Sequence, residues 1–275
     1  MSSSHRGRGR EGGRGGKGRG SLPRDIVVSK ALSKLLRHQA ELFGLKLGEG
    51  GYVNVKDVLA TPPIRTLHVT PDEIASVVAT NNKQRFSLAH RTTPSSPLSD
   101  PTDLAADPSA YLIRANQGHS IAVDATGLLE PLTLADGDAD AGSGAHLPDM
   151  VVHGTTNAAW PLIVASGGLK PMGRNHVHFA AGLPAGFAPL EPLPATRELM
   201  DAPPVISGMR STSSVLIFID LPKALAAGVD FWRSSNGVIL SAGNADGVVP
   251  LDVFLRVEAR KRGGKVLLRD GKLCK

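Results

Sequence analysis

The chain has 275 residues, 41% of them hydrophobic, and a single cysteine, Cys274. This length allows two domains, or one domain with large insertions, and one cysteine excludes a disulfide framework and a cysteine-based zinc site. The net charge of +6 is uneven, because residues 1–20 contribute about +5 of it. No run of apolar residues is long enough for a membrane span, so we expect an intracellular protein, cytoplasmic and/or nuclear.

Residues 1–21 are rich in Arg and Gly and almost free of apolar side chains. Such a segment cannot bury enough surface to offset its ordering entropy, so it is predicted to be a disordered tail. Its arginines could contact RNA phosphates without sequence preference, or they could simply keep the protein soluble. Both interpretations stay open.

A helix is predicted to begin near Asp25. Its apolar stripe ends immediately before Arg37 and His38, and Ser29 and Lys30 are expected to face outward. By themselves, two basic residues at a helix end would do no more than oppose the helix dipole. The predicted stripe consists of Ile26, Ala31, Leu32, Leu35 and Leu36.

A second helix is predicted to begin at Thr70, with Glu73 closing a capping box. Residues 83–88 and 111–115 resemble the two strands of a hairpin, and residues 90–108 resemble an insertion at its tip. A further short strand is expected at residues 121–123. Helices followed by a hairpin indicate a winged-helix-like lobe, and we assign it residues 22–133.

The second half of the chain is dominated by strand-like runs, which indicates a mostly antiparallel sheet and an α+β fold. We predict a linker at residues 134–147 and a second lobe at residues 148–260. This lobe has a Pro-rich insertion at 182–204, and a basic C-terminal tail is expected at 261–275. The expected strands include residues 151–152, 177–179, 215–220, 237–241 and 254–257.

The densest polar stretch is 150–180, which contains one Arg and three His at the edges of predicted elements. A short strand is expected to stop at His153-Gly154-Thr155, where glycine would let another molecule approach the backbone. After a short helix, residues 174–179 resemble a strand. A period of two would place Arg174, His176 and His178 on one face.

These residue types favour a phosphate-handling site between two lobes. His176 and His178 lack the Cys or carboxylate partners of a metal site, so we expect no metal. There is no nucleophile-elbow motif for a serine hydrolase, and no dinucleotide or Walker fingerprint. Arg side chains without paired carboxylates bind phosphate oxygens well, and His adds a titratable donor.

Six short motifs occur along the chain: LSKLLRH (32–38), NNKQRF (81–86), NQGHS (116–120), HGT (153–155), GRNHVH (173–178) and SNGV (235–238). Their order is that found in the NAD-dependent RNA 2'-phosphotransferases, the tRNA-splicing 2'-phosphotransferase family, which this chain resembles. The resemblance spans roughly residues 29–257. It implies an N-terminal winged-helix RNA lobe packed against a C-terminal ADP-ribosyltransferase-like lobe.

The resemblance also implies roles for single residues. Arg37, His38, Arg85 and Arg174 would form a catalytic tetrad, the first three holding the RNA 2'-phosphate. His119 and Ser120 would assist substrate binding. The residues implied for NAD binding are His153, Gly154, Thr155, His176 and Asn236.

The implied reaction has two steps, without a metal. The RNA 2'-phosphate displaces nicotinamide from NAD, and the ADP-ribose 2''-hydroxyl then takes the phosphate, leaving an RNA 2'-hydroxyl and ADP-ribose 1'',2''-cyclic phosphate. The implied partners are NAD and RNA with an internal 2'-phosphate, in practice spliced tRNA, and we expect a monomer. Two alternatives stay open: an ADP-ribosyltransferase that caps terminal phosphates of nucleic acids, and an RNA-binding module with a degenerate NAD pocket.

Overall fold

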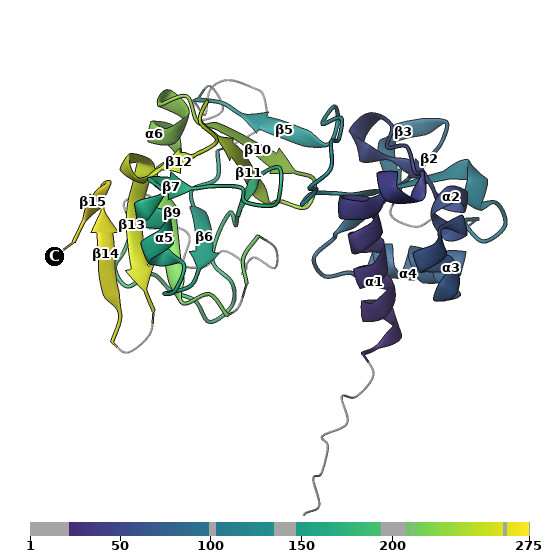
Figure 1. Cartoon of the computed structure of the whole chain (residues 1–275), viewed down its shortest axis with the longest axis horizontal. Helices are drawn as coiled ribbons and strands as arrows, with labels where there is room; N and C mark the ends of the chain where they lie inside the picture. Colours follow the sequence, from purple (N-terminus) through teal and green to yellow (C-terminus); the bar gives the residue numbers. More distant parts are fainter. Residues whose placement is uncertain are drawn as a thin grey trace, which may run out of the picture.

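A computed structural model describes residues 22–98, 103–134, 147–193, 208–210, 212–260 and 263–274. The predicted tail at 1–21, most of the predicted linker and the second half of the 182–204 insertion lie outside these residues. Two bodies lie side by side (Figure 1): the first carries α1 to α4 with β1 to β4, and the second carries the remaining strands. Each has its own hydrophobic core.

The first body is built on α1, which ends in a π-helical turn. The predicted apolar stripe is confirmed for Leu32, Leu35 and Leu36, which are fully buried. It is wrong for Ile26, which is 38% exposed, and for Ser29, which is buried. Val28 lies four residues before Leu32 and therefore takes the core position. The helical elements are α1 (Arg24–Lys34), the π-helix (Leu35–Gln39), α2 (Val55–Ala60), α3 (Pro62–Thr66) and α4 (Pro71–Thr80).

The capping box predicted for α4 is confirmed. The Thr70 hydroxyl accepts a hydrogen bond from the Glu73 backbone amide (3.2 Å), and the Glu73 carboxylate accepts one from the Thr70 amide (3.0 Å). These bonds satisfy two amides that the helix itself leaves unpaired. Within the described residues, no helix combines the length and the apolar character needed to cross a membrane.

The sheet of the first body has the strand order β1-β4-β2-β3. β2 and β4 pair antiparallel, as the hairpin prediction expected. The 90–108 insertion is more ordered than a plain loop: it contributes an edge strand, and Leu104 is buried in the core. The strand expected at 121–123 does not form. The strands are β1 (Val53–Asn54), β2 (Phe86–His90), β3 (Thr93–Leu98) and β4 (Tyr111–Ala115).

The second body contains a five-stranded sheet of order β15-β14-β13-β9-β6, a four-stranded sheet of order β5-β10-β11-β8 and the pair β12-β7. All strand pairs among the described residues are antiparallel, which confirms a mixed α and β fold with mostly antiparallel sheets. The elements are β5 (Leu129–Leu132), β6 (Val151–Thr155), α5 (Trp160–Ala165), β7 (Gly168–Leu169), β8 (Val177–Phe179), β9 (Val215–Ile219), α6 (Leu221–Ala226), β10 (Asp230–Ser234), β11 (Ile239–Gly243), β12 (Val249–Pro250), β13 (Phe254–Ala259), β14 (Lys265–Arg269) and β15 (Lys272–Leu273).

Two predicted boundaries are wrong. β5 precedes the predicted linker but pairs with β10, so residues 129–132 belong to the second body. The C-terminal residues do not form a tail, because β14 pairs with β13 and Leu268 is fully buried in the core. The apolar run of Val266, Leu267 and Leu268, bounded by Lys265 and Arg269, was the overlooked strand signal.

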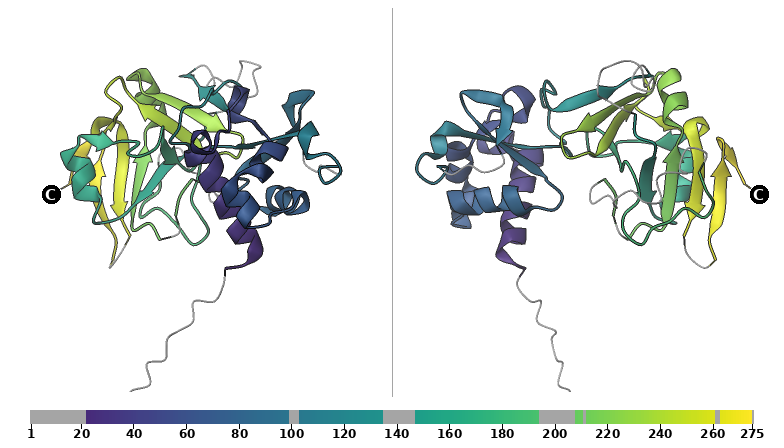
Figure 2. Two further views of the ribbon diagram at one scale, coloured as in Figure 1. Left: turned by 45° about the vertical axis from the view of Figure 1, so that its right-hand side comes forward. Right: turned by 180° about the vertical axis from the view of Figure 1, so that it is seen from behind.

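The two strands around the 150–180 stretch also differ from the prediction. β6 does not stop at His153: it continues to Thr155, paired with β9 along its whole length. β8 is only Val177–Phe179, so Arg174 and His176 lie on bends before it rather than on one strand face. The β10–β11 end of the second body faces the first body (Figure 2).

Candidate functional site

Arg37 and His38 lie in the π-helical turn that extends α1. π-helical turns are rare in proteins, and those that do occur are frequently found at functional sites. Buried Leu35 and Leu36 fix this turn to the core. Two bonds fix it to the loop after β4: the His38 Nδ1 lies 2.8 Å from the Ser120 hydroxyl, and the Ser120 amide donates to the Arg37 carbonyl (3.0 Å).

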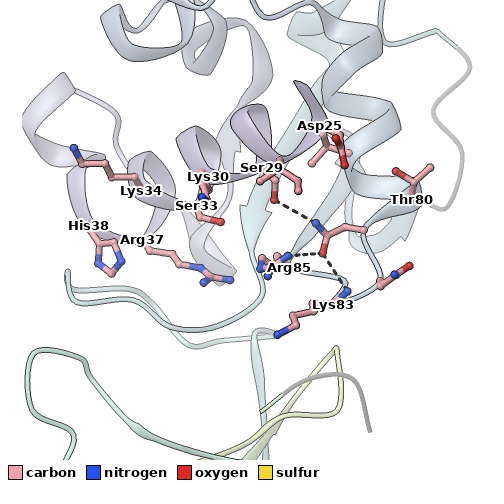
Figure 3. A pocket seen from close by; sticks show the side chains of 14 residues that line it. Asp25, Ser29, Lys30, Ser33, Lys34, Arg37, His38, Thr80, Lys83 and Arg85 are labelled. Carbon is pink, nitrogen blue, oxygen red and sulfur yellow. Dashed lines mark hydrogen bonds between the residues drawn. The ribbon is translucent and has the colours of Figure 1, made fainter. Parts of the chain in front are cut away.

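Arg85 is held by the loop between α4 and β2. The Asn81 side-chain oxygen accepts hydrogen bonds from the Arg85 guanidinium (2.9 Å) and from the Lys83 amide (3.1 Å). The Asn81 nitrogen donates to the buried Ser29 hydroxyl (3.2 Å), which ties the loop to α1. Figure 3 shows Arg37 and Arg85 pointing toward one another from opposite walls of one groove.

Three arginines lie close enough to repel each other. Burial, followed by the charges of Arg85 and Arg174, lowers the pKa of Arg37 to about 10. Burial also lowers the pKa of Arg174, and Arg210 adds to this. None of the ion pairs among the described residues involves these side chains. The site is therefore a concentration of positive charge that no ion pair among the described residues neutralises.

Arg37 also has unused hydrogen-bond donors. Its Nε and Nη2 are buried and have no partner among the described residues. Unpaired buried donors cost roughly 1–3 kcal/mol each, and a charged group costs more. A phosphate would satisfy both donors and neutralise the charge. His38 stays neutral near pH 7, because burial and then Arg37 lower its pKa.

The NQGHS segment lies between the two bodies. Burial, followed by the charge of Arg37, lowers the pKa of His119 to about 4, and its Nε2 has no partner among the described residues. The His119 carbonyl accepts the Asn175 amide (3.0 Å), and the Asn175 side chain donates to the Ile121 carbonyl (2.9 Å). Ser120 binds His38 as described above, so His119 and Ser120 connect the tetrad residues to the second body.

His178 occupies the centre of this junction. Its Nδ1 lies 3.0 Å from the His176 carbonyl and its Nε2 lies 2.7 Å from the Gln117 side-chain oxygen. Burial and Arg174 lower the pKa of His178 to about 3, so the ring is neutral and has one N–H. Since both neighbours are oxygens, rotation of the Gln117 amide by half a turn would let its nitrogen donate to Nε2.

The HGT residues are brought near this junction but are more enclosed than expected. The His153 Nδ1 lies 2.8 Å from the His178 carbonyl, and burial lowers the pKa of His153. Gly154 is half-buried, and the side on which a side chain would stand is filled, because a Cβ there would overlap Met209 and Ser213. Glycine is thus required by packing inside the protein.

The other residues implied for NAD binding contact the rest of the chain as follows. The Thr155 carbonyl accepts the Ser214 amide (2.9 Å). The His176 ring meets the Trp232 ring edge-on, with centroids 5.5 Å apart. Asn236, in the turn between β10 and β11, donates to the Lys83 carbonyl (2.9 Å) and so reaches the loop that carries Arg85.

Sequence reasoning missed three residues that shape the site. Asn81 orients Arg85, Gln117 contacts His178, and Arg210 adds a fourth arginine next to Arg174. Asn81 lies in the same motif as Arg85, and Gln117 lies in the same motif as His119. This closeness in the sequence could have marked both residues as part of the site. Arg210 follows a Pro-rich insertion, and its position carried no signal by itself.

The site can bind anions and orient them, because its donors are Arg and neutral His side chains. Among the described residues, no group of three His, Cys, Asp or Glu side chains could hold a metal ion. In short, the structure brings together Arg37, His38, Arg85 and Arg174, and places His119, Ser120, His153 and Asn236 around them.

Comparison with known proteins identifies the family. The family described as RNA 2'-phosphotransferase, Tpt1 / KptA family matches residues 23–243. The chain is 42% identical to tRNA 2'-phosphotransferase 1 of Bos taurus, with 84% of this chain and 74% of that protein covered. The corresponding values are 41%, 82% and 72% for Homo sapiens, and 36%, 90% and 93% for Danio rerio. A match over most of the chain, joined to a cluster of arginines that form no ion pair within the part of the chain that the structure describes, means that this protein belongs to the RNA 2'-phosphotransferase family.

Proposed function

We propose that this enzyme removes the internal 2'-phosphate left at the splice junction of ligated tRNA, and that NAD accepts the phosphate. The observation that carries the proposal is the cluster of Arg37, Arg85 and Arg174, which lacks a described counter-ion. Relatives named tRNA 2'-phosphotransferase support the substrate. The predicted division into a winged-helix-like lobe and an ADP-ribosyltransferase-like lobe remains part of this proposal.

Arg37, His38 and Arg85 would hold the RNA 2'-phosphate. Arg37 offers its two unused donors, and Arg85 still has donors free after its bond to Asn81. Arg174 would help to neutralise the negative charges of the RNA 2'-phosphate and of the NAD pyrophosphate. Preorganised donors of this kind accelerate a reaction by stabilising the charge of its transition state, each by roughly 100- to 1000-fold. His119 and Ser120 would keep the π-helical turn in place.

The residues present fit NAD, because a dinucleotide brings a pyrophosphate to a site with excess positive charge. NAD would supply the ribose carbon and hydroxyl that take the phosphate, with loss of nicotinamide. His153, Gly154, Thr155, His176 and Asn236 are proposed to line its position, with His153 fixed by the His178 carbonyl. Because one chain supplies all of these residues, we propose that a monomer is active.

The test is incubation with a short RNA that bears one internal, radiolabelled 2'-phosphate, with and without NAD. We expect NAD-dependent transfer of the label to ADP-ribose 1'',2''-cyclic phosphate and release of nicotinamide. Nicotinamide release with ADP-ribose retained on a terminal phosphate would indicate the capping alternative. Binding of RNA without any nicotinamide release would indicate a binding module and contradict the proposal.

A further inference from the structure

A groove of about 670 Å³ extends from the arginine cluster along α1 and the start of the 81–85 loop. Arg37, His38 and Arg85 form one end of it, as Figure 3 shows. The volume is large for a single phosphate group and lies in the range that accommodates a drug-sized ligand. The groove therefore continues beyond the atoms that the reaction needs.

The charges of this groove are strongly one-sided. Fourteen residues line it, and five of them are Lys or Arg, whereas Asp25 is the one carboxylate among them. Lys30 and Lys34 are exposed, and neither has an ion-pair partner among the described residues. Burial, with help from Arg85, lowers the pKa of Lys83, which lies on the opposite wall.

The spacing of the cations follows from the helix. Lys30 and Lys34 are four residues apart, and His38 is four residues further, so the three lie along one side of α1 and its π-helical extension. At a rise of 1.5 Å per residue, Lys30 and His38 are separated by roughly 12 Å along the axis. About three nucleotides of a stacked strand cover that length.

Apart from the imidazole of His38, the lining contains no aromatic ring, so most of the groove offers no aromatic surface on which bases could stack. Its hydroxyl and amide groups, from residues such as Ser33 and Asn82, suit phosphate and sugar oxygens instead. The chemistry of the groove thus fits the backbone of a nucleic acid strand and offers little means of reading its sequence.

From these observations we infer that the α1 groove binds the RNA strand flanking the 2'-phosphate, with Lys30 and Lys34 contacting its backbone phosphates. The inference rests on the proposed function, since it places the phosphorylated nucleotide at Arg37 and Arg85. Contacts of this kind would make the affinity for the RNA depend on the number of nucleotides that flank the 2'-phosphate and not on their sequence.

The test compares wild type with the double variant Lys30→Gln/Lys34→Gln. Gln keeps the helix propensity of Lys and removes the charge. The substrates are a dinucleotide with an internal 2'-phosphate and an RNA with about three further nucleotides on each side. We expect KM for the longer RNA to rise about tenfold, clearly more than KM for the dinucleotide. The salt dependence of log KM for the longer RNA should fall by about 1.4.

The control is Lys56→Gln/Lys265→Gln, which removes two exposed charges away from the groove. It should leave the length dependence of KM as in wild type. Equal losses on both substrates, or a loss shared by the control, would overturn the inference. A wild type inactive on both substrates would refute the proposed function, and the groove would then be judged by binding alone. For that purpose, fluorescence anisotropy with a labelled single-stranded RNA that lacks the 2'-phosphate must show weaker binding by the double variant than by the control.

Discussion

The 81–85 loop and the 174–178 segment each bring an arginine, Arg85 or Arg174, to the site between the two bodies, and they are held in different ways. In the 81–85 loop, the Arg85 guanidinium itself is anchored to Asn81, and Asn236 of the second body holds the backbone. In the 174–178 segment the backbone is held through Asn175, and the Arg174 guanidinium has no hydrogen bond to another described residue. One arginine is positioned before substrate arrives, and the other is free to adjust to it.

The largest effect is expected from Arg85→Ala. A preorganised donor that faces the transferred phosphate contributes most, so 2'-phosphate removal should slow by about 100-fold or more. The fold should persist, because the side chain is only partly buried. Steady-state kinetics measure the rate of 2'-phosphate removal, and a thermal melt measures the stability of the fold. Arg91→Ala, at an exposed arginine just after β2, is the matched control. A wild-type rate in Arg85→Ala would disprove the assignment of the phosphate site.

A smaller effect is expected from loss of the contacts between the bodies. Asn236→Ala removes the bond to the Lys83 carbonyl, and kcat should fall about tenfold because Arg85 loses its fixed position. Asn175→Ala removes the bond to the Ile121 carbonyl, which lies on the other side of the cleft. Each variant should lose about 1 kcal/mol of stability. If the two variants reduce kcat equally, the contrast between anchored and free arginines is incorrect.

The third prediction concerns pH and the stability of the protein rather than its catalytic rate. His178 is neutral in the folded state, with a pKa of about 3, whereas in the unfolded chain it binds a proton below its ordinary pKa of 6.5. This residue therefore makes stability fall as pH drops from about 6.5 toward 3, by at most about 1.4 kcal/mol per pH unit. In His178→Gln the slope should be shallower by up to that amount.

Urea unfolding between about pH 7 and pH 5 measures this slope. The difference between the two proteins at about pH 8, where residue 178 is uncharged in both, reports the change in packing and hydrogen bonding without a change of charge. An unchanged slope would mean that His178 is already protonated in the fold, with both ring nitrogens donating to oxygens.

Local signals in the sequence predicted some parts of the structure well. The α4 capping box and the β2–β4 pairing depend on neighbouring residues or on simple alternation, and both are present. Register effects were missed: Val28 replaces Ile26 in the core because the helix phase is set by packing. The ends of β6 and β8 also depend on tertiary partners, since pairing with β9 keeps Gly154 extended.

The same distinction applies to the site. The ordered motifs of the family that the chain resembles were enough to expect four side chains together: Arg37, His38, Arg85 and Arg174. Asn81 and Gln117 act through side-chain hydrogen bonds between distant segments, which no pattern along the chain displays. The closed packing over Gly154 likewise depends on Met209, 55 positions further along.

The five-stranded sheet has a consequence for solubility. β15 is an outer strand of only two residues, both exposed, and Lys272 and Arg269 lie next to each other at that border. At the opposite border, the Val152 amide and carbonyl already bond to Ala180. An edge strand with unpaired backbone groups can pair with a strand of another chain and so start aggregation. Edge strands that are short, carry cationic side chains or already have their backbone groups hydrogen-bonded resist this pairing. Removing the last residues to trim an apparently dispensable end would expose β14, so such a truncation should aggregate.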